Sequence, residues 1–138
     1  MPVFSNPELL QTTLKTLFAR VGQDPEAAKS VVNSRLILRM RVTAPEADVV
    51  VNGRRNPPQI TYGKTPLRPD LEIELSADAL HKILLGELRL SSAVAARQLV
   101  VRGPIHKSFV FEEIFHSAQA FYPSVLEEVG LDGYRKLS

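Results

Sequence analysis

Two spacings of apolar residues alternate along this chain. Apolar side chains recur every three or four positions over residues 7–21 and 25–35, which predicts two amphipathic helices. From residue 36 to 43 they recur at every second position, as in a strand with one buried face. Shorter runs with this period follow at residues 47–51, 59–62, 71–75 and 99–101. The pattern therefore predicts five strands.

Capping residues and proline mark the ends of the helices. Asn6 and Asp24 each precede a proline, the order that is typical of a helix N-terminus. Ser76 is a suitable N-cap for a third helix, and Gly86 can end that helix in the left-handed conformation. Further helices are expected at 91–96, at about 106–122, and at 124–129 after an interruption by Pro123.

The order of these elements predicts an α+β fold. Three strands come consecutively, and most strands have one apolar and one polar face, which is typical of an antiparallel sheet covered on one side. We therefore expect a five-stranded, largely antiparallel sheet with helices packed on one face. A chain of 138 residues fits a single domain, residues 1–138, with helical segments at 1–35 and 106–129.

Composition and charge exclude several classes of protein. The net charge is +2, so the attraction of the whole molecule to nucleic acid would be weak. There is no cysteine, which excludes disulfides, thiolate catalysis and thiolate metal sites. No apolar run exceeds four residues, and the first ten residues lack the features of a signal peptide. These features predict a soluble cytoplasmic protein.

The residues that could act in catalysis or bind a metal do not form a constellation. His106 and His116 are ten residues apart, which is too far for two ligands on one helix face. Adjacent glutamates on a helix diverge by about 100°, so the pairs at 112–113 and 127–128 do not converge on one atom. No glycine-rich phosphate loop is present. We expect no catalytic residue, no metal and no cofactor.

Basic residues are concentrated between positions 35 and 55, where five arginines occur. Proteins that read single-stranded nucleic acid add aromatic platforms to such a surface. Because Tyr62 is the only aromatic residue on a predicted strand, no nucleic-acid partner is expected. Arg54 and Arg55 fall on a turn-rich loop and are candidates for transient contact with an anionic membrane. The alternative for this loop is an ordinary solvated hairpin.

Aromatic residues are concentrated on the last long helix. Four of the six phenylalanines lie within thirteen residues, and Tyr122 adjoins them. Phe109 and Phe111 point about 200° apart around a helix, so the apolar surface is wider than one stripe. Three interpretations of this surface remain open: a wide contact with the core, a dimer interface, and the wall of a cavity.

Residues 71–103 carry apolar and small residues at a characteristic spacing. The set is Leu71, Ile73, Leu75, Ser76, Asp78, Leu80, Leu84, Leu85, Gly86, Glu87, Leu88, Ala93, Val94, Leu99, Val101 and Gly103. In this spacing the chain resembles the sterol carrier protein two family of small lipid-binding domains, over roughly residues 36–122. It departs from the family at Arg97, where a glycine is usual, and at Val100, where an outward-facing lysine is common.

The resemblance implies both a function and a set of ligand-contacting residues. Domains of this family enclose an apolar tunnel between the sheet and the helices, and bind a fatty acid, an acyl-coenzyme A or a sterol-like lipid without covalent chemistry. The candidate wall residues are Leu38, Met40, Val49, Val51, Ile73, Leu75, Leu80, Leu84, Leu88, Val94, Leu99, Val101, Phe111 and Phe115. One alternative is an accessory module that presents a lipid intermediate to a partner enzyme or forms a homodimer. A second alternative is an enzyme that acts at the cavity through His81 or Glu87.

Overall fold

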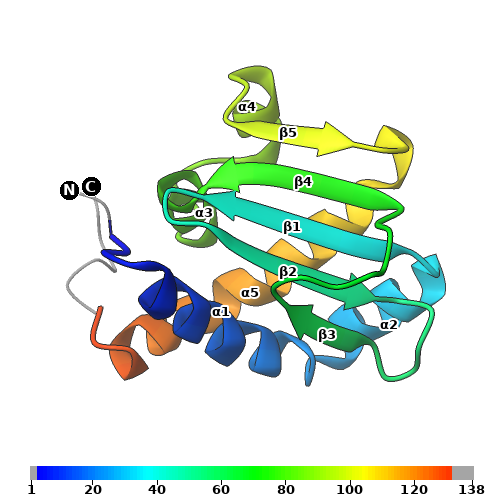
Figure 1. The fold of residues 1–138 in the computed structure, drawn as a ribbon, viewed down its shortest axis with the longest axis horizontal. Helices are drawn as coiled ribbons and strands as arrows, with labels where there is room; N and C mark the ends of the chain where they lie inside the picture. The colour runs from blue at the N-terminus through cyan, green and yellow to red at the C-terminus, as the bar shows by residue number, and fades with distance from the viewer. Residues whose placement is uncertain (1–2, 132–138) are drawn as a thin grey trace.

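A five-stranded sheet with helices against one face forms the protein, and the computed structural model describes residues 3–131 (Figure 1). The strands are β1 (Ile37–Thr43), β2 (Ala47–Asn52), β3 (Gln59–Tyr62), β4 (Leu71–Ser76) and β5 (Leu99–Arg102). The helices are α1 (Pro7–Val21), α2 (Pro25–Ser34), α3 (Ala77–Leu84), α4 (Leu90–Ala95), the 3-10 helix η1 (Ile105–Lys107) and α5 (Phe109–Glu128). Helix α5 crosses behind the sheet in Figure 1, and helices α1, α2 and α3 each pack against α5. The predicted α+β fold is confirmed.

The strands lie in the order β3-β2-β1-β4-β5. β1 and β4 run parallel, and the other three pairings are antiparallel, so the sheet is largely antiparallel as expected. β3 and β4 run in the same direction and are separated by β2 and β1, so a hairpin cannot join them. The connector at residues 63–70 crosses the sheet face opposite α5 (Figure 1). The N–H of Gly63 donates to the carbonyl of Asp48 at 3.0 Å, and the N–H of Asp70 donates to the carbonyl of Ile37 at 2.7 Å.

The strand register separates an apolar face from a charged one. Met40 of β1 lies between Val49 of β2 and Ile73 of β4, and all three are buried on the side of α5. Equivalent positions along each strand repeat this arrangement, since alternate side chains of a strand share a face. The alternation of apolar and polar residues in the sequence therefore identified the inner face of the sheet correctly.

Charged side chains on the opposite face offset one another. Arg39 forms ion pairs with Asp48 at 3.0 Å and with Glu72 at 3.1 Å. Arg102 of β5 forms ion pairs with Glu72 at 2.9 Å and with Glu74 at 3.0 Å. Arg39 of β1 is thus balanced by carboxylates of the neighbouring strands, on a face that the connector partly covers.

The predicted helix starts are confirmed, but the predicted break in the last helix is wrong. Asn6, Asp24 and Ser76 each accept a hydrogen bond from a backbone N–H in the helix that follows, at 2.8, 3.1 and 3.1 Å. Pro123, however, lies inside α5, and the helix continues past it. Proline in a helix interior costs about 3 kcal/mol. Burial of Tyr122 before it, and of the side chains in the turn after it, offsets that cost.

A buried hydrogen bond links α3 to α5. Nδ1 of His81 lies 2.6 Å from the hydroxyl of Tyr122, and neither residue is exposed. The ring of Phe4 packs edge-on against the imidazole, with the ring centroids 6.2 Å apart. Burial raises the pKa of Tyr122, so the hydroxyl keeps its proton. His81 therefore belongs to the core.

The turn between α4 and β5 holds Arg97 in the left-handed conformation, with φ of +59°. This backbone costs a non-glycine residue about 1–2 kcal/mol, and the family resemblance expects glycine here. Replacing Arg97 with glycine should raise the free energy of unfolding by about 1 kcal/mol, because the relief of strain exceeds the entropy that glycine loses on folding. Urea denaturation measures the change.

The neighbouring variant Ala96→Gly is the matched control, because Ala96 has an ordinary φ of −86°. This variant should lower the free energy of unfolding by about 0.5–1 kcal/mol. A loss of stability in both variants would contradict the assignment of strain to Arg97.

Candidate functional site

An apolar slot opens at the β5 edge of the sheet. It has a volume of about 570 Å³, which lies within the range of roughly 300–1,000 Å³ that is typical of ligand pockets. Its walls come from β4 and β5, from α4 and η1, and from the start of α5. The lining residues are Ile73, Leu90, Ser91, Val94, Arg97, Leu99, Val100, Val101, Ile105, Ser108, Phe111 and Glu112.

The position of β5 and the short length of α4 explain this opening. β5 is an edge strand that pairs with β4 alone, and Val101 lies opposite Ile73 in that pair. Helix α4 has only six residues, with Leu90 and Val94 one turn apart on the same side. Figure 1 shows α4 beyond the outer edge of β5. Because so short a helix covers little of the strand, space remains between β5 and the start of α5.

Polar side chains also border the slot. They are the hydroxyls of Ser91 and Ser108, the carboxylate of Glu112 and the guanidinium of Arg97. Arg97 is exposed and forms no ion pair with any residue from 3 to 131. The slot thus offers an apolar wall to a hydrocarbon chain, and hydroxyls and a cation to a polar end.

A much smaller void lies under the centre of the sheet. Its volume is about 10 Å³, which is close to the least that can hold one water molecule. Phe18 of α1 and Phe111, Ile114 and Phe115 of α5 occupy the space between the helices and the strands. Phe111 lines both this inner void and the slot. Phe111 therefore separates the slot from the inner void, where the resemblance implied one continuous tunnel.

The fourteen candidate wall residues fall into separate groups. Those in the slot are Ile73, Val94, Leu99, Val101 and Phe111. Those around the inner void are Leu38, Met40, Val49, Val51, Phe111 and Phe115. Leu75 and Leu88 border two other depressions, and Leu80 and Leu84 are buried outside both the slot and the void.

Three apolar residues of the slot were not among the sequence candidates, namely Leu90, Val100 and Ile105. The spacing of Leu90 and Val94 by four residues was a signal for the first. Ile105 follows Gly103 and Pro104, which end the last strand. It lies in the short η1 helix, which is too short to show a repeating pattern of apolar residues.

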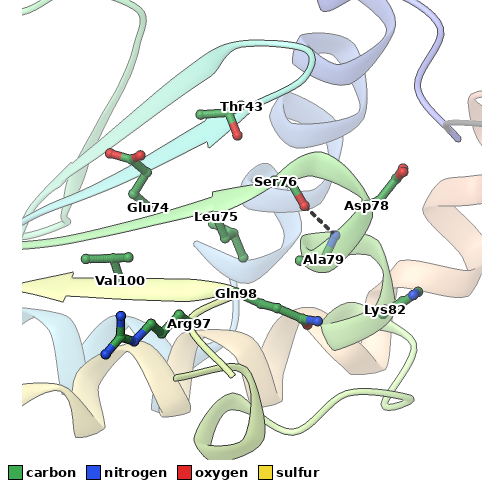
Figure 2. A pocket seen from close by; sticks show the side chains of 10 residues that line it. All are labelled: Thr43, Glu74, Leu75, Ser76, Asp78, Ala79, Lys82, Arg97, Gln98 and Val100. Atoms are coloured by element: carbon green, nitrogen blue, oxygen red, sulfur yellow. Dashed lines mark hydrogen bonds between the residues drawn. The ribbon is translucent and has the colours of Figure 1, made fainter. Parts of the chain in front are cut away.

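A second depression, the polar groove, lies where β4 passes into α3 (Figure 2). Its volume is about 410 Å³. Carboxylates of Glu74 and Asp78 and cations of Lys82 and Arg97 border it, so its charges are mixed. The dashed line in Figure 2 is the hydrogen bond by which Ser76 caps α3. The slot is the better candidate for an apolar ligand, because its lining is predominantly apolar.

Residues that could support other functions lie outside the slot. His81 is enclosed by Tyr122 and Phe4, and Glu87 is exposed on the loop after α3. Among the described residues, no group of three or more histidine, aspartate or glutamate side chains could hold a metal ion. None of the helices described is long and apolar enough to cross a membrane.

The Arg54–Arg55 loop is tied to the connector that crosses the sheet. The guanidinium of Arg54 donates to both carboxylate oxygens of Asp70, at 2.9 and 2.8 Å, and to the carbonyl of Arg35 at 3.2 Å. Nη2 makes both bonds to Asp70 and Nε makes the bond to Arg35, so the guanidinium is held at two points. Arg55 is exposed and has no ion-pair partner within residues 3–131.

Comparison with protein families agrees with this architecture. A model described as the SCP-2 sterol transfer family matches residues 14–116, which is most of the chain. The chain belongs to the SCP-2 sterol transfer family. The matched region contains all five strands, α3, α4 and the start of α5, and thus every element that lines the slot. The resemblance inferred from the sequence is confirmed.

Solved structures share the fold of this SCP-2 family member at low sequence identity. Sterol carrier protein 2 from Yarrowia lipolytica is 22% identical with a TM-score of 0.58, and the match covers 72% of this chain and 85% of that chain. The sterol carrier protein domain 2 of Helicoverpa armigera is 16% identical with a TM-score of 0.61, over 79% and 89% of the two chains. The ubiquinone synthesis protein UbiJ-SCP2 is 17% identical with a TM-score of 0.55, over 77% and 84%. No curated protein matches the chain in sequence.

Proposed function

We propose that this SCP-2 family member binds a lipid chain in the slot and transfers it without chemical change. The observation that carries the proposal is the slot itself, because residues of the inner sheet face such as Leu99 and Val101 line an open apolar space there. Membership of a sterol transfer family supports it. The proposal takes residues 1–138 as one binding unit.

Burial of hydrocarbon supplies enough free energy for binding without a reactive group. Each buried methylene contributes about 0.8 kcal/mol, so a chain of about sixteen carbons could gain on the order of 12 kcal/mol. Association and ordering cost roughly 4–15 kcal/mol. An affinity in the micromolar range is therefore within reach. Selectivity between neighbouring chain lengths should be modest, because one methylene changes the affinity only about fourfold.

The polar border of the slot favours a lipid with one polar end. Arg97 can pair with a carboxylate or a phosphate, and the hydroxyls of Ser91 and Ser108 can hydrogen-bond to the same group. A fatty acid or an acyl-coenzyme A has this chemistry. We propose binding and not catalysis, because neither His81 nor Glu87 lines the slot.

Native mass spectrometry of protein purified without detergent tests whether the protein carries a lipid. We expect a lipid adduct on the folded protein, and titration with a fluorescent fatty acid should give saturable binding. A protein that shows no adduct and does not bind the fluorescent fatty acid would refute the proposed function.

Aspartate in place of Val101 should weaken binding of the fluorescent fatty acid at least about 30-fold, a loss of about 2 kcal/mol. Val101 is half-buried in the wall of the slot, and a lipid chain that enters would remove water from the new carboxylate. Fluorescence titration measures the affinity, and circular dichroism reports whether the fold is retained.

Ile60→Asp is the matched control for this variant. Ile60 is also half-buried, faces the same side of the sheet and lies on the opposite edge strand, β3, away from the slot. It should lose a similar amount of stability but keep its affinity for the fatty acid. An equal loss of affinity in both variants would show that Val101 has no special place in the binding wall.

A second candidate function is that of an accessory module that presents a lipid to a partner or forms a homodimer. Exposure of Val100 on the edge strand favours it, because this side chain adds apolar surface at the edge of the sheet. The same fold occurs in UbiJ-SCP2, a protein named for ubiquinone synthesis, and a lipid presented to a biosynthetic enzyme would suit such a fold. The mass of the intact species in native mass spectrometry distinguishes a monomeric carrier from a homodimer.

A further inference from the structure

The slot and the polar groove adjoin at the start of β5. Arg97 and Val100 line both of them. Val100 lies opposite Glu74 in the pairing of β4 with β5, so its side chain is on the sheet face away from α5. Arg97 lies in the turn that precedes β5. A ligand that occupies the slot can therefore extend around the start of β5 into the groove.

Three of the four charged side chains that border the groove have no partner of opposite charge. The fourth, Glu74, forms an ion pair with an arginine of β5 at 3.0 Å. Asp78, Lys82 and Arg97 are exposed, and none of them forms an ion pair with any residue from 3 to 131. The carboxylate of Asp78 accepts only a long hydrogen bond from the N–H of Val3, at 3.4 Å, among the bonds of the described residues. The groove thus offers two cations and one anion to a ligand.

These three charges have a definite order along the groove. Figure 2 shows Arg97 and Val100 at one end of it, and Asp78 and Lys82 at the other, on α3. Asp78 and Lys82 are four residues apart on this helix, so they are neighbours on one face with their Cβ atoms about 5–6 Å apart. A ligand that extends out of the slot meets a cation first, and then an anion and a cation next to each other.

We propose that the polar groove binds the head group of the lipid, and that this head group carries a phosphate, an ammonium and a carboxylate, as phosphoserine does. The phosphate pairs with Arg97 beside the slot, the ammonium with Asp78 and the carboxylate with Lys82. The ammonium and the carboxylate of serine are attached to one carbon atom, which suits two neighbouring side chains of opposite charge. The inference rests on the proposed function, because the lipid chain occupies the slot.

Other common head groups match the groove less well. Aromatic side chains recognise a quaternary ammonium such as choline, and none of the described residues that line the groove is aromatic. A head group with a phosphate alone would leave Asp78 beside a ligand of the same sign of charge. Phosphoethanolamine would satisfy Asp78 but leave Lys82 without a partner. A head group with three charges uses every unpaired charge of the groove.

Displacement of a fluorescent fatty acid by lysolipids tests the proposal. The lysolipids share one acyl chain, differ only in the head group and are used below the concentration at which they form micelles. An exposed ion pair improves affinity at most about fivefold. Lysophosphatidylserine should therefore bind up to about fivefold more tightly than lysophosphatidylethanolamine, which should bind up to about fivefold more tightly than lysophosphatidylcholine.

Two variants should each remove one step of this order. Asp78→Asn should abolish the preference for lysophosphatidylethanolamine over lysophosphatidylcholine, because the ammonium loses its partner. Lys82→Gln should abolish the preference for lysophosphatidylserine over lysophosphatidylethanolamine, because the carboxylate loses its partner. The matched controls are Glu26→Gln and Lys29→Gln, which make the same changes of charge on exposed residues of α2, outside the slot and the groove. Both controls should keep the order of the wild-type protein.

Lysophosphatidylglycerol separates specific contacts from long-range attraction. It has the same net charge as lysophosphatidylserine but neither an ammonium nor a carboxylate, so it should bind about as weakly as lysophosphatidylcholine. Equal affinity for lysophosphatidylglycerol and lysophosphatidylserine would overturn the proposal. Retention of the wild-type order in both Asp78→Asn and Lys82→Gln would overturn it as well, because the head group would then lie elsewhere.

Free O-phosphoserine distinguishes a lipid head group from a small soluble ligand. Calorimetric titration should show little binding, because the chain in the slot supplies most of the free energy. Binding of O-phosphoserine as tight as that of lysophosphatidylserine would make the groove an independent site and overturn the proposal. A protein that binds the fluorescent fatty acid but does not discriminate among the lysolipids would refute this inference alone. A protein that binds no fluorescent fatty acid would refute the proposed function and this inference together.

Discussion

Replacing Phe111 with alanine should let the protein bind a longer acyl chain and should lower the free energy of unfolding by about 3–5 kcal/mol. Phe111 is 6% exposed and lines both the slot and the inner void. Removing the ring would join the two spaces and extend the slot toward the centre of the sheet. The loss of stability follows from the cavity that the missing ring leaves behind.

Displacement of a fluorescent fatty acid by unlabelled fatty acids of increasing length measures the change. Each methylene that the extended slot admits should improve the affinity about fourfold, so the preferred chain length should increase. Phe115→Ala is the matched control, because Phe115 lies one turn further along α5 and lines the void but not the slot. It should lose similar stability without a change in preferred length. An unchanged preference in Phe111→Ala would show that this ring does not limit the slot.

Replacing Leu84 with aspartate should unfold the protein. Leu84 is 3% exposed and lies outside the slot and the inner void. A Leu→Ala change in a core costs about 2–5 kcal/mol, and an unpaired buried carboxylate adds several more. The total approaches the whole stability of a typical domain, about 5–15 kcal/mol. Circular dichroism and urea denaturation measure the result.

The adjacent variant Leu85→Asp is the control for Leu84. Leu85 is half-buried at the end of α3, so a carboxylate there can reach water. This variant should stay folded and lose only about 1–2 kcal/mol. A Leu84→Asp protein that folds normally and loses only its affinity for a fatty acid would instead place Leu84 in the binding wall.

Local signals in the sequence were sufficient for most of the fold. The alternation of Leu38, Met40 and Val42 with arginines identified the inner face of β1, because side chains of a strand alternate between two sides. Asn6 and Ser76 identified helix starts, because a side-chain oxygen must satisfy the backbone donors that a helix leaves open. These inferences held because each depends on residues close together in the chain.

The candidate site was predicted only as a set of inward-facing residues. Met40 and Ile73 show the same alternation and lie on the same sheet face, yet Ile73 lines the slot and Met40 only the inner void. The difference comes from Phe111, Ile114 and Phe115 of α5, which occupy the space under the middle strands. A cavity is the space left after side chains of several elements have packed. The spacing of apolar residues within one helix or strand therefore cannot predict it.

Local patterns in the sequence were sufficient to predict the strands, the capped helix starts, the family, and the departure from the usual family glycine at Arg97. Tertiary structure alone decided that α5 continues through Pro123, that His81 is enclosed by Tyr122, and that the open apolar space lies at the β5 edge. The physical reason is the same in each case: these features depend on contacts between segments far apart in the chain, whose packing energies exceed local preferences.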